Sequence, residues 1–170
     1  MKFAKFAFVG LSTLVLATPV WAEIEVKDAY ARSSGPMAQA GAAFMHIVNT
    51  SDQEDRLIGV RADVSKRTEL HTHIDAGGGV MKMREVEDGF VIPAGGHHIL
   101  KRGGDHVMFM GLVEPFEQDK TIPVTLIFEQ AGEVVVEIPV DLDRQDSTGH
   151  GTMNHDGGHG SEHDNMKHSH

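Results

Sequence analysis

The sequence predicts an all-β protein, either a β-sandwich or a small barrel, and three observations lead to this prediction. Ten short segments between residues 23 and 143 are apolar or alternate apolar with polar side chains, as β-strands do. Glycine, proline and polar turn residues separate them at short intervals. No comparable stretch repeats apolar residues at helical spacing. Many strands without intervening helices are typical of sandwiches and barrels.

The first five segments contain β-branched or aromatic residues and end in polar or glycine-containing turns, which favours strands. They cover residues 24–34, 40–49, 55–63, 68–74 and 80–87. The glycine-rich stretch 74–79 separates the last two, so we expect these two strands to form a hairpin.

The other five segments follow the same pattern and cover residues 89–94, 97–102, 105–112, 121–129 and 133–141. The final two are rich in Val and Ile, and the turn EQAGEV between them predicts a second hairpin.

The first 22 residues have the pattern of a secretory signal peptide. Lys2 and Lys5 precede an apolar stretch from Phe6 to Leu16, and small residues stand near the end at Ala22. A retained membrane anchor is the alternative, but the apolar stretch is short against the roughly 20 residues that span a bilayer. We expect cleavage after residue 22, export to the periplasm and no stable membrane insertion of the mature chain.

The composition excludes several kinds of function. The chain has 15 Lys and Arg against 25 Asp and Glu, a net charge of −10, and loss of the signal peptide removes two of the lysines. This acidity disfavours nucleic acid as a partner. There is no cysteine, so thiol catalysis, iron–sulfur clusters, thiolate zinc sites and type 1 copper centres are excluded.

Residues 144–170 differ from the domain at 23–143 because they contain no Leu, Ile, Val or aromatic residue. Such a segment cannot bury enough apolar surface to fold, so we expect a disordered tail. Its histidines and methionines indicate a metal-binding tail for Cu(II) or a second copper, although a solubilising tail with incidental histidines is the alternative. The donors are His150, Met153, His155, His159, His163, Met166, His168 and His170.

Two segments of the domain concentrate imidazole and thioether groups. His71 and His73 share one strand face, Met81 and Met83 share a face of the next strand, and in 105–112 the alternation puts His106, Met108 and Met110 opposite Val107 and Phe109. Thioethers are neutral and soft, so this mixture suits Cu(I). Taken singly, Met81 and Met110 are expected to pack in the core, and His46, His97 and His98 to lie on the surface.

These segments resemble the periplasmic PCu(A)C-type copper chaperones. The resemblance lies in ELHTH (69–73), GVMKMREVE (79–87) and GGDHVMFMGL (103–112), and extends to VTLIFEQAGEVVVEIPV (124–140). It implies a cupredoxin-like Greek-key β-sandwich with Cu(I) ligands at His71, Met83, His106 and Met108. The stretch 74–79 is one residue longer than the commonest family spacing, which leaves His73 as a substitute ligand. Arg102 stands where the family often has proline before the two glycines.

The resemblance also implies a function. We expect a monomeric carrier, not an enzyme, that delivers Cu(I) to the CuA or CuB centre of a respiratory haem-copper oxidase. Its partners would be the apo copper-site subunit and another periplasmic copper or thiol-reductant assembly protein. The main alternative is a copper or zinc buffer without a dedicated acceptor. A copper enzyme and a structural β-sandwich rank below these.

Overall fold

The structure, a computed structural model, describes residues 24–144, and all ten predicted strands are present there. Their bounds are β1 (Ile24–Ser33), β2 (Ala40–Asn49), β3 (Asp55–Arg61), β4 (Ser65–Asp75), β5 (Met81–Glu85), β6 (Phe90–Ile92), β7 (His97–Leu100), β8 (His106–Leu112), β9 (Thr121–Phe128) and β10 (Gly132–Pro139). The predicted signal peptide and almost all of the predicted tail lie outside the described residues, so both stay predictions.

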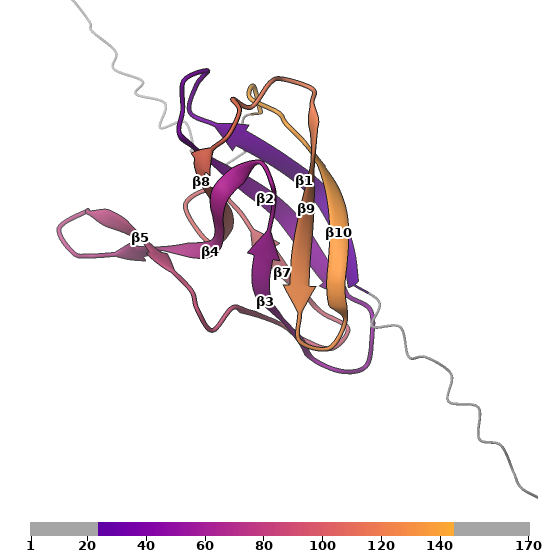
Figure 1. The fold of residues 1–170 in the computed structure, drawn as a ribbon. Coiled ribbons are helices and arrows are strands. Elements are labelled where there is room, and N and C mark those ends of the chain that lie inside the picture. The colour runs from indigo at the N-terminus through magenta and orange to yellow at the C-terminus, as the bar shows by residue number, and fades with distance from the viewer. Residues whose placement is uncertain (1–23, 145–170) are drawn as a thin grey trace, which may run out of the picture.

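The strands form two sheets that pack face to face, which confirms the sandwich and excludes the barrel (Figure 1). The larger sheet has the order β1-β2-β8-β4-β5, with β7 also paired to β2, and the smaller one has the order β10-β9-β3-β6. All strand pairs within the sheets are antiparallel, and both predicted hairpins, β4–β5 and β9–β10, are present.

The core lies between the two sheets. Val107 and Phe109 of β8 are fully buried there. Their alternation with His106 and Met108 left either face of the strand as the buried one, and the structure buries this face. They join a continuous apolar cluster drawn from both sheets, which includes Leu57, Leu126 and Ile138. Because one face of β8 is fixed in this core, its other face must point out of the sandwich.

The β4–β5 hairpin extends beyond the body of the sandwich (Figure 1). All five residues of β5 are exposed, and Met81 and Met83 are 53% and 52% exposed. The prediction that Met81 packs in the core is therefore wrong, because β5 is an edge strand that extends past the second sheet. The hairpin instead carries its methionines to the surface.

No helix in the part of the chain that the structure describes is long and apolar enough to cross a membrane.

Candidate metal-binding site

The predicted site residues gather on the outward face of β4, β5 and β8. In the sheet register, His71 lies opposite His106 and His73 lies opposite Met83. Residues that face each other across antiparallel strands point to the same side of a sheet, and so do residues two apart on one strand. Two separate segments of the sequence therefore meet on one surface.

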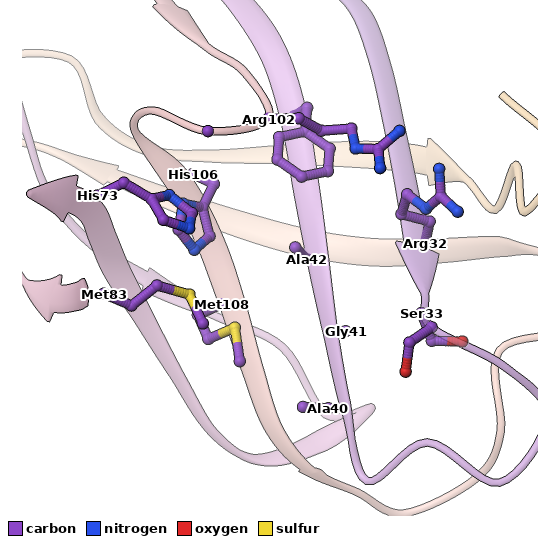
Figure 2. A pocket seen from close by; sticks show the side chains of 13 residues that line it. Arg32, Ser33, Ala40, Gly41, Ala42, His73, Met83, Arg102, His106 and Met108 are labelled. Carbon is purple, nitrogen blue, oxygen red and sulfur yellow. The ribbon is translucent and has the colours of Figure 1, made fainter. Parts of the chain in front are cut away.

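A cavity of about 480 Å³ opens on this face. His73, Met83, His106 and Met108 all line it, and Figure 2 shows the two imidazole rings and the two thioether groups at the same end. Three of the four predicted ligands thus come together with the predicted substitute, His73. His71 is not among the lining residues.

The carbonyl of Gly104 fixes the orientation of both lining imidazoles. It lies 3.2 Å from Nδ1 of His73 and 2.9 Å from Nδ1 of His106. A carbonyl only accepts hydrogen bonds, so each Nδ1 carries the proton and each Nε2 keeps its lone pair. A hydrogen bond from the second nitrogen is the usual support of a metal-binding histidine.

His106 is the most enclosed of the donors, at 2% exposure. Burial lowers its pKa below the ordinary value, and the neighbouring His73 and His71 lower it further, against the opposing effect of the hydrogen bond to Gly104. The imidazole is therefore neutral at neutral pH, which is the form that binds a metal.

His71 has a different environment. Its Nε2 lies 2.9 Å from Oε2 of Glu69, whose other oxygen accepts from Nε of Arg67 at 2.7 Å. Burial raises the pKa of Glu69, but the hydrogen bonds from His71 and Arg67 outweigh it, and the pKa is lowered overall. The carboxylate thus keeps the proton of His71 on Nε2. The other nitrogen, Nδ1, is buried without a hydrogen-bond partner. The assignment of His71 as a ligand stays a prediction.

The arrangement places two imidazole nitrogens and two thioether sulfurs where they could bind one metal ion. No three His, Asp or Glu side chains among residues 24–144 are grouped as a metal site, so a site here needs the two methionines. Neutral soft sulfur favours Cu(I) over Zn(II), Mg(II) or Ca(II).

The remaining histidines and methionines of the domain lie outside the cavity. His98 bonds to Asp105 at 2.9 Å and stacks on the ring of Phe90, while His46 and His97 are exposed. Met110 is half-buried beside Nη2 of Arg67, at 4.0 Å. All eight predicted tail donors lie outside the described residues.

Sequence reasoning missed the residues that shape the rest of the cavity. Its opposite end is lined by Arg32 and Arg102, and the small Ala42 forms part of its floor (Figure 2). The role of Gly104 was also missed, because a backbone carbonyl has no sequence signal. Glu69 stands two residues before His71, on the same strand face, and that spacing was the one available signal for their contact.

Comparison with known proteins decides the family. The sequence model of the LpqE-like family, described as "Putative lipoprotein LpqE-like", matches residues 24–140. The chain belongs to this family. "Putative lipoprotein Lxx21020" of Leifsonia xyli subsp. xyli (strain CTCB07) is 32% identical to this LpqE-like chain over 117 residues, which cover 69% of each protein.

Solved structures agree with the fold of the LpqE-like domain. Cu(I)-bound DR1885 from Deinococcus radiodurans has a TM-score of 0.56 and 31% identity, covering 73% of this chain and 83% of its own. A copper-bound PCuAC domain from PmoF2 has a TM-score of 0.57 and 24% identity, and the match covers 70% of this chain and 92% of that domain. These likenesses confirm the predicted relation to PCu(A)C-type proteins and the cupredoxin-like sandwich.

Proposed function

We propose that this LpqE-like protein is a periplasmic carrier of Cu(I). The observation that carries the proposal is the single cavity in which His73 and His106 present Nε2 lone pairs beside the thioethers of Met83 and Met108. The Cu(I)-bound state of the relative DR1885 supports it.

His73 is proposed as the imidazole ligand from β4, in place of His71. His73 lines the cavity, lies opposite Met83 in the register, and has its ring centre 5.1 Å from that of His106. Two imidazoles bound to one metal at about 2.0–2.1 Å have ring centres a few ångströms from it, so this spacing suits a shared ion. His71 does not line the cavity, but its Nδ1 is buried without a hydrogen-bond partner, so His71 is the alternative to be tested.

The exposure of the donors supports a carrier rather than an enzyme. Met83 is 52% exposed on an edge hairpin, while His106 is buried at the base of the same cavity. An incoming ligand can thus replace the outer thioether before the inner imidazole is released. Neutral thioethers bind copper exchangeably, and a set of four donors with two thioethers stabilises Cu(I) against oxidation.

We propose that the chain acts as a monomer and delivers its copper to the CuA or CuB centre of a haem-copper oxidase. A copper-loaded chain mixed anaerobically with the apo CuA domain should transfer its Cu(I), and metal analysis of the two proteins after their separation would report the transfer. A mixture in which copper stays on the carrier would argue for a buffer instead.

The tail is proposed to bind additional copper, mainly as Cu(II), through its imidazoles. Removal of residues 145–170 should lower the Cu(II) stoichiometry while Cu(I) affinity at the cavity persists. Unchanged Cu(II) binding after truncation would remove the tail from the proposal.

The core assignment is tested by anaerobic Cu(I) titration against a competing chelator. Met83→Leu and Met108→Leu keep the side-chain volume but remove the sulfur. Each should weaken Cu(I) binding by more than about tenfold. Removal of a group that only hydrogen-bonds to a metal ligand already lowers metal affinity by about tenfold or more, and removal of the ligand itself should cost at least as much. Met37→Leu, at an exposed position outside the cavity, is the matched control. Zn(II) that displaces Cu(I) from the wild-type protein would instead favour the buffering function.

A further inference from the structure

We propose that Met81 and Met83 form a second, outer binding site for Cu(I) on the β4–β5 hairpin, through which the ion enters and leaves the cavity. The inference rests on the proposed carrier function, because Met83 would belong to both sites. Met81 is the thioether of the segment MKM (81–83) that does not line the cavity, and it is 53% exposed. The carrier function alone leaves it without a role.

The two methionines point to the same side of the hairpin. In the register of β4 with β5, Met83 lies opposite His73 and Met81 lies opposite Asp75. Residues two apart on a strand share a face and lie about 6.5–7 Å apart along it. Methionine is unbranched and flexible, so both sulfurs can reach one ion placed between them. Two soft sulfurs make a weak Cu(I) site, which suits transient binding.

The hairpin places this pair between solvent and the buried end of the cavity. β5 is the last strand of the larger sheet, and the hairpin extends beyond the sandwich (Figure 1). Figure 2 shows the thioether of Met83 beside that of Met108, and His106 is only 2% exposed. The donors therefore form a series from Met81 outside, through Met83, to His106 inside. A Cu(I) ion can move along this series by exchanging one ligand at a time.

The charges of the hairpin favour a cation on the methionine face. Lys82 and Arg84 alternate with the methionines, so they point to the opposite face. Asp75 shares the face of Met81, and its Oδ1 accepts a hydrogen bond from the amide of Gly77 at 2.8 Å. A carboxylate on this face attracts a cation. Its oxygens are hard donors, so the thioethers remain the preferred ligands of Cu(I).

An outer site of this kind changes rates rather than affinity. Met81 would bind the ion only while it passes, so loss of its sulfur raises the barrier for entry and for exit alike and leaves the loaded and empty states unchanged. Met83 would also bind in the loaded state, so loss of its sulfur lowers the affinity. This difference distinguishes an exchange ligand from a permanent one.

The test compares the full chain of the wild type with Met81→Leu, which keeps the apolar volume and removes the sulfur. Stopped-flow absorbance follows anaerobic transfer of Cu(I) from the loaded chain to a coloured chelator, and uptake from the chelator complex. Both rates should fall at least about threefold in Met81→Leu, while the affinity stays within about twofold of the wild type. Met37→Leu, exposed and outside the cavity, should leave the rates and the affinity unchanged.

A matched variant moves the thioether to the other face of the hairpin. Ile74 lies opposite Lys82 and is 38% exposed. Ile74→Met combined with Met81→Leu therefore restores the number of methionines in the hairpin but not the face. Transfer should stay slow in this double variant. Recovery of the wild-type rates would overturn the pairing of Met81 with Met83.

NMR of methionine methyl groups provides a direct readout of contact with the metal. The methyl resonance of Met81 should shift or broaden as Cu(I) is added, and that of Met37 should not. A Met81 resonance that Cu(I) leaves unchanged, or transfer rates of Met81→Leu equal to those of Met37→Leu, would overturn the inference. An affinity loss as large as that of Met83→Leu would also overturn it, since Met81 would then be a permanent ligand.

Cu(I) uptake by the wild type, measured by chelator competition, separates the two proposals. Absence of uptake refutes the carrier function. Uptake with rates that do not depend on Met81 refutes only the outer site.

Discussion

His73 and His106 share one hydrogen-bond acceptor, the carbonyl of Gly104, although 32 residues of chain separate the two histidines. The shared acceptor gives both rings the same tautomer, with Nε2 as the lone-pair atom. The proposed Cu(I) site is thus oriented in the metal-free structure, which would lower the cost of ordering its ligands.

The first prediction separates the two histidines of β4. His73→Ala should weaken Cu(I) binding by more than about tenfold, because it removes a proposed ligand that lines the cavity. His71→Ala should have a smaller effect, since its ring does not line the cavity. Chelator competition measures both affinities. A larger loss for His71→Ala would return the ligand role to that residue.

The second prediction concerns the turn that presents Gly104. Gly103 has a φ of 76°, a left-handed conformation that costs other residues about 1–2 kcal/mol. Gly103→Ala should lower both the stability and the Cu(I) affinity, because the turn that holds both imidazoles must shift.

Gly78→Ala is the matched control for this turn. Its φ is 64°, and an added Cβ meets nothing within 4 Å at either glycine. The backbone cost is therefore similar, but Gly78 lies at the tip of the β4–β5 hairpin, away from Gly104. Thermal unfolding should show similar losses of stability, and Cu(I) titration should show lower affinity only for Gly103→Ala. Equal affinities for the two variants would mean that the turn does not orient the ligands.

The third prediction is a pH dependence of the copper-free protein. The folded state lowers the pKa of His106, so below the ordinary pKa of about 6.5 the unfolded chain takes up this proton more readily than the folded one. This contribution to the free energy of unfolding is present above pH 6.5 and is lost as the pH falls through the lowered pKa.

Urea unfolding between pH 7.5 and 5 measures this contribution. The free energy of unfolding of the wild type should fall more steeply toward acid than that of His106→Gln, which lacks the titrating group. His73 and His71 interact with His106, so the difference between the two profiles reports the titration of His106 together with its coupling to these two rings. Parallel pH profiles would show that burial of His106 does not disfavour its protonation.

The fourth prediction concerns the stability of the β-sandwich rather than the copper site. Asp55 is 3% exposed, and its carboxylate accepts hydrogen bonds from the amides of Arg56, Gln130 and Ala131 at 2.7–2.9 Å. It thereby ties the start of β3 to the β9–β10 turn. Asp55→Ala leaves these amides without their acceptor and should cost about 1–3 kcal/mol in the free energy of unfolding.

Chemical denaturation measures this loss, and the exposed Asp52→Ala serves as the control. The Cu(I) affinity of folded Asp55→Ala should match that of the wild type, because Asp55 belongs to the sheet opposite the cavity. A stability loss no larger than that of Asp52→Ala would show that these hydrogen bonds contribute little.

The strands could be predicted from the sequence, but the pairings that build the cavity could not. Short apolar and alternating runs marked all ten strands, because burial of one face leaves a local pattern. Alternation alone did not decide which face of residues 105–112 is buried; the histidine and methionine pattern of the other segment and the family resemblance favoured Val107 and Phe109 inward, as the structure has them. Met81 was wrongly assigned to the core, since local pattern does not reveal that β5 extends beyond the second sheet. Arg32 reaches the cavity only through the pairing of β1 with β2 and of β2 with β8, and such long-range pairings are not encoded in any one segment.

The measurement that tests the central claim most directly is X-ray absorption at the copper edge of the Cu(I)-loaded full chain, compared with its Met83→Leu/Met108→Leu variant. With one equivalent of Cu(I), the wild type should show both sulfur and nitrogen neighbours, and the double variant should lose the sulfur contribution. A wild-type spectrum with nitrogen and oxygen neighbours alone, or a sulfur contribution that persists in the variant, would contradict a Cu(I) site built from His73, Met83, His106 and Met108.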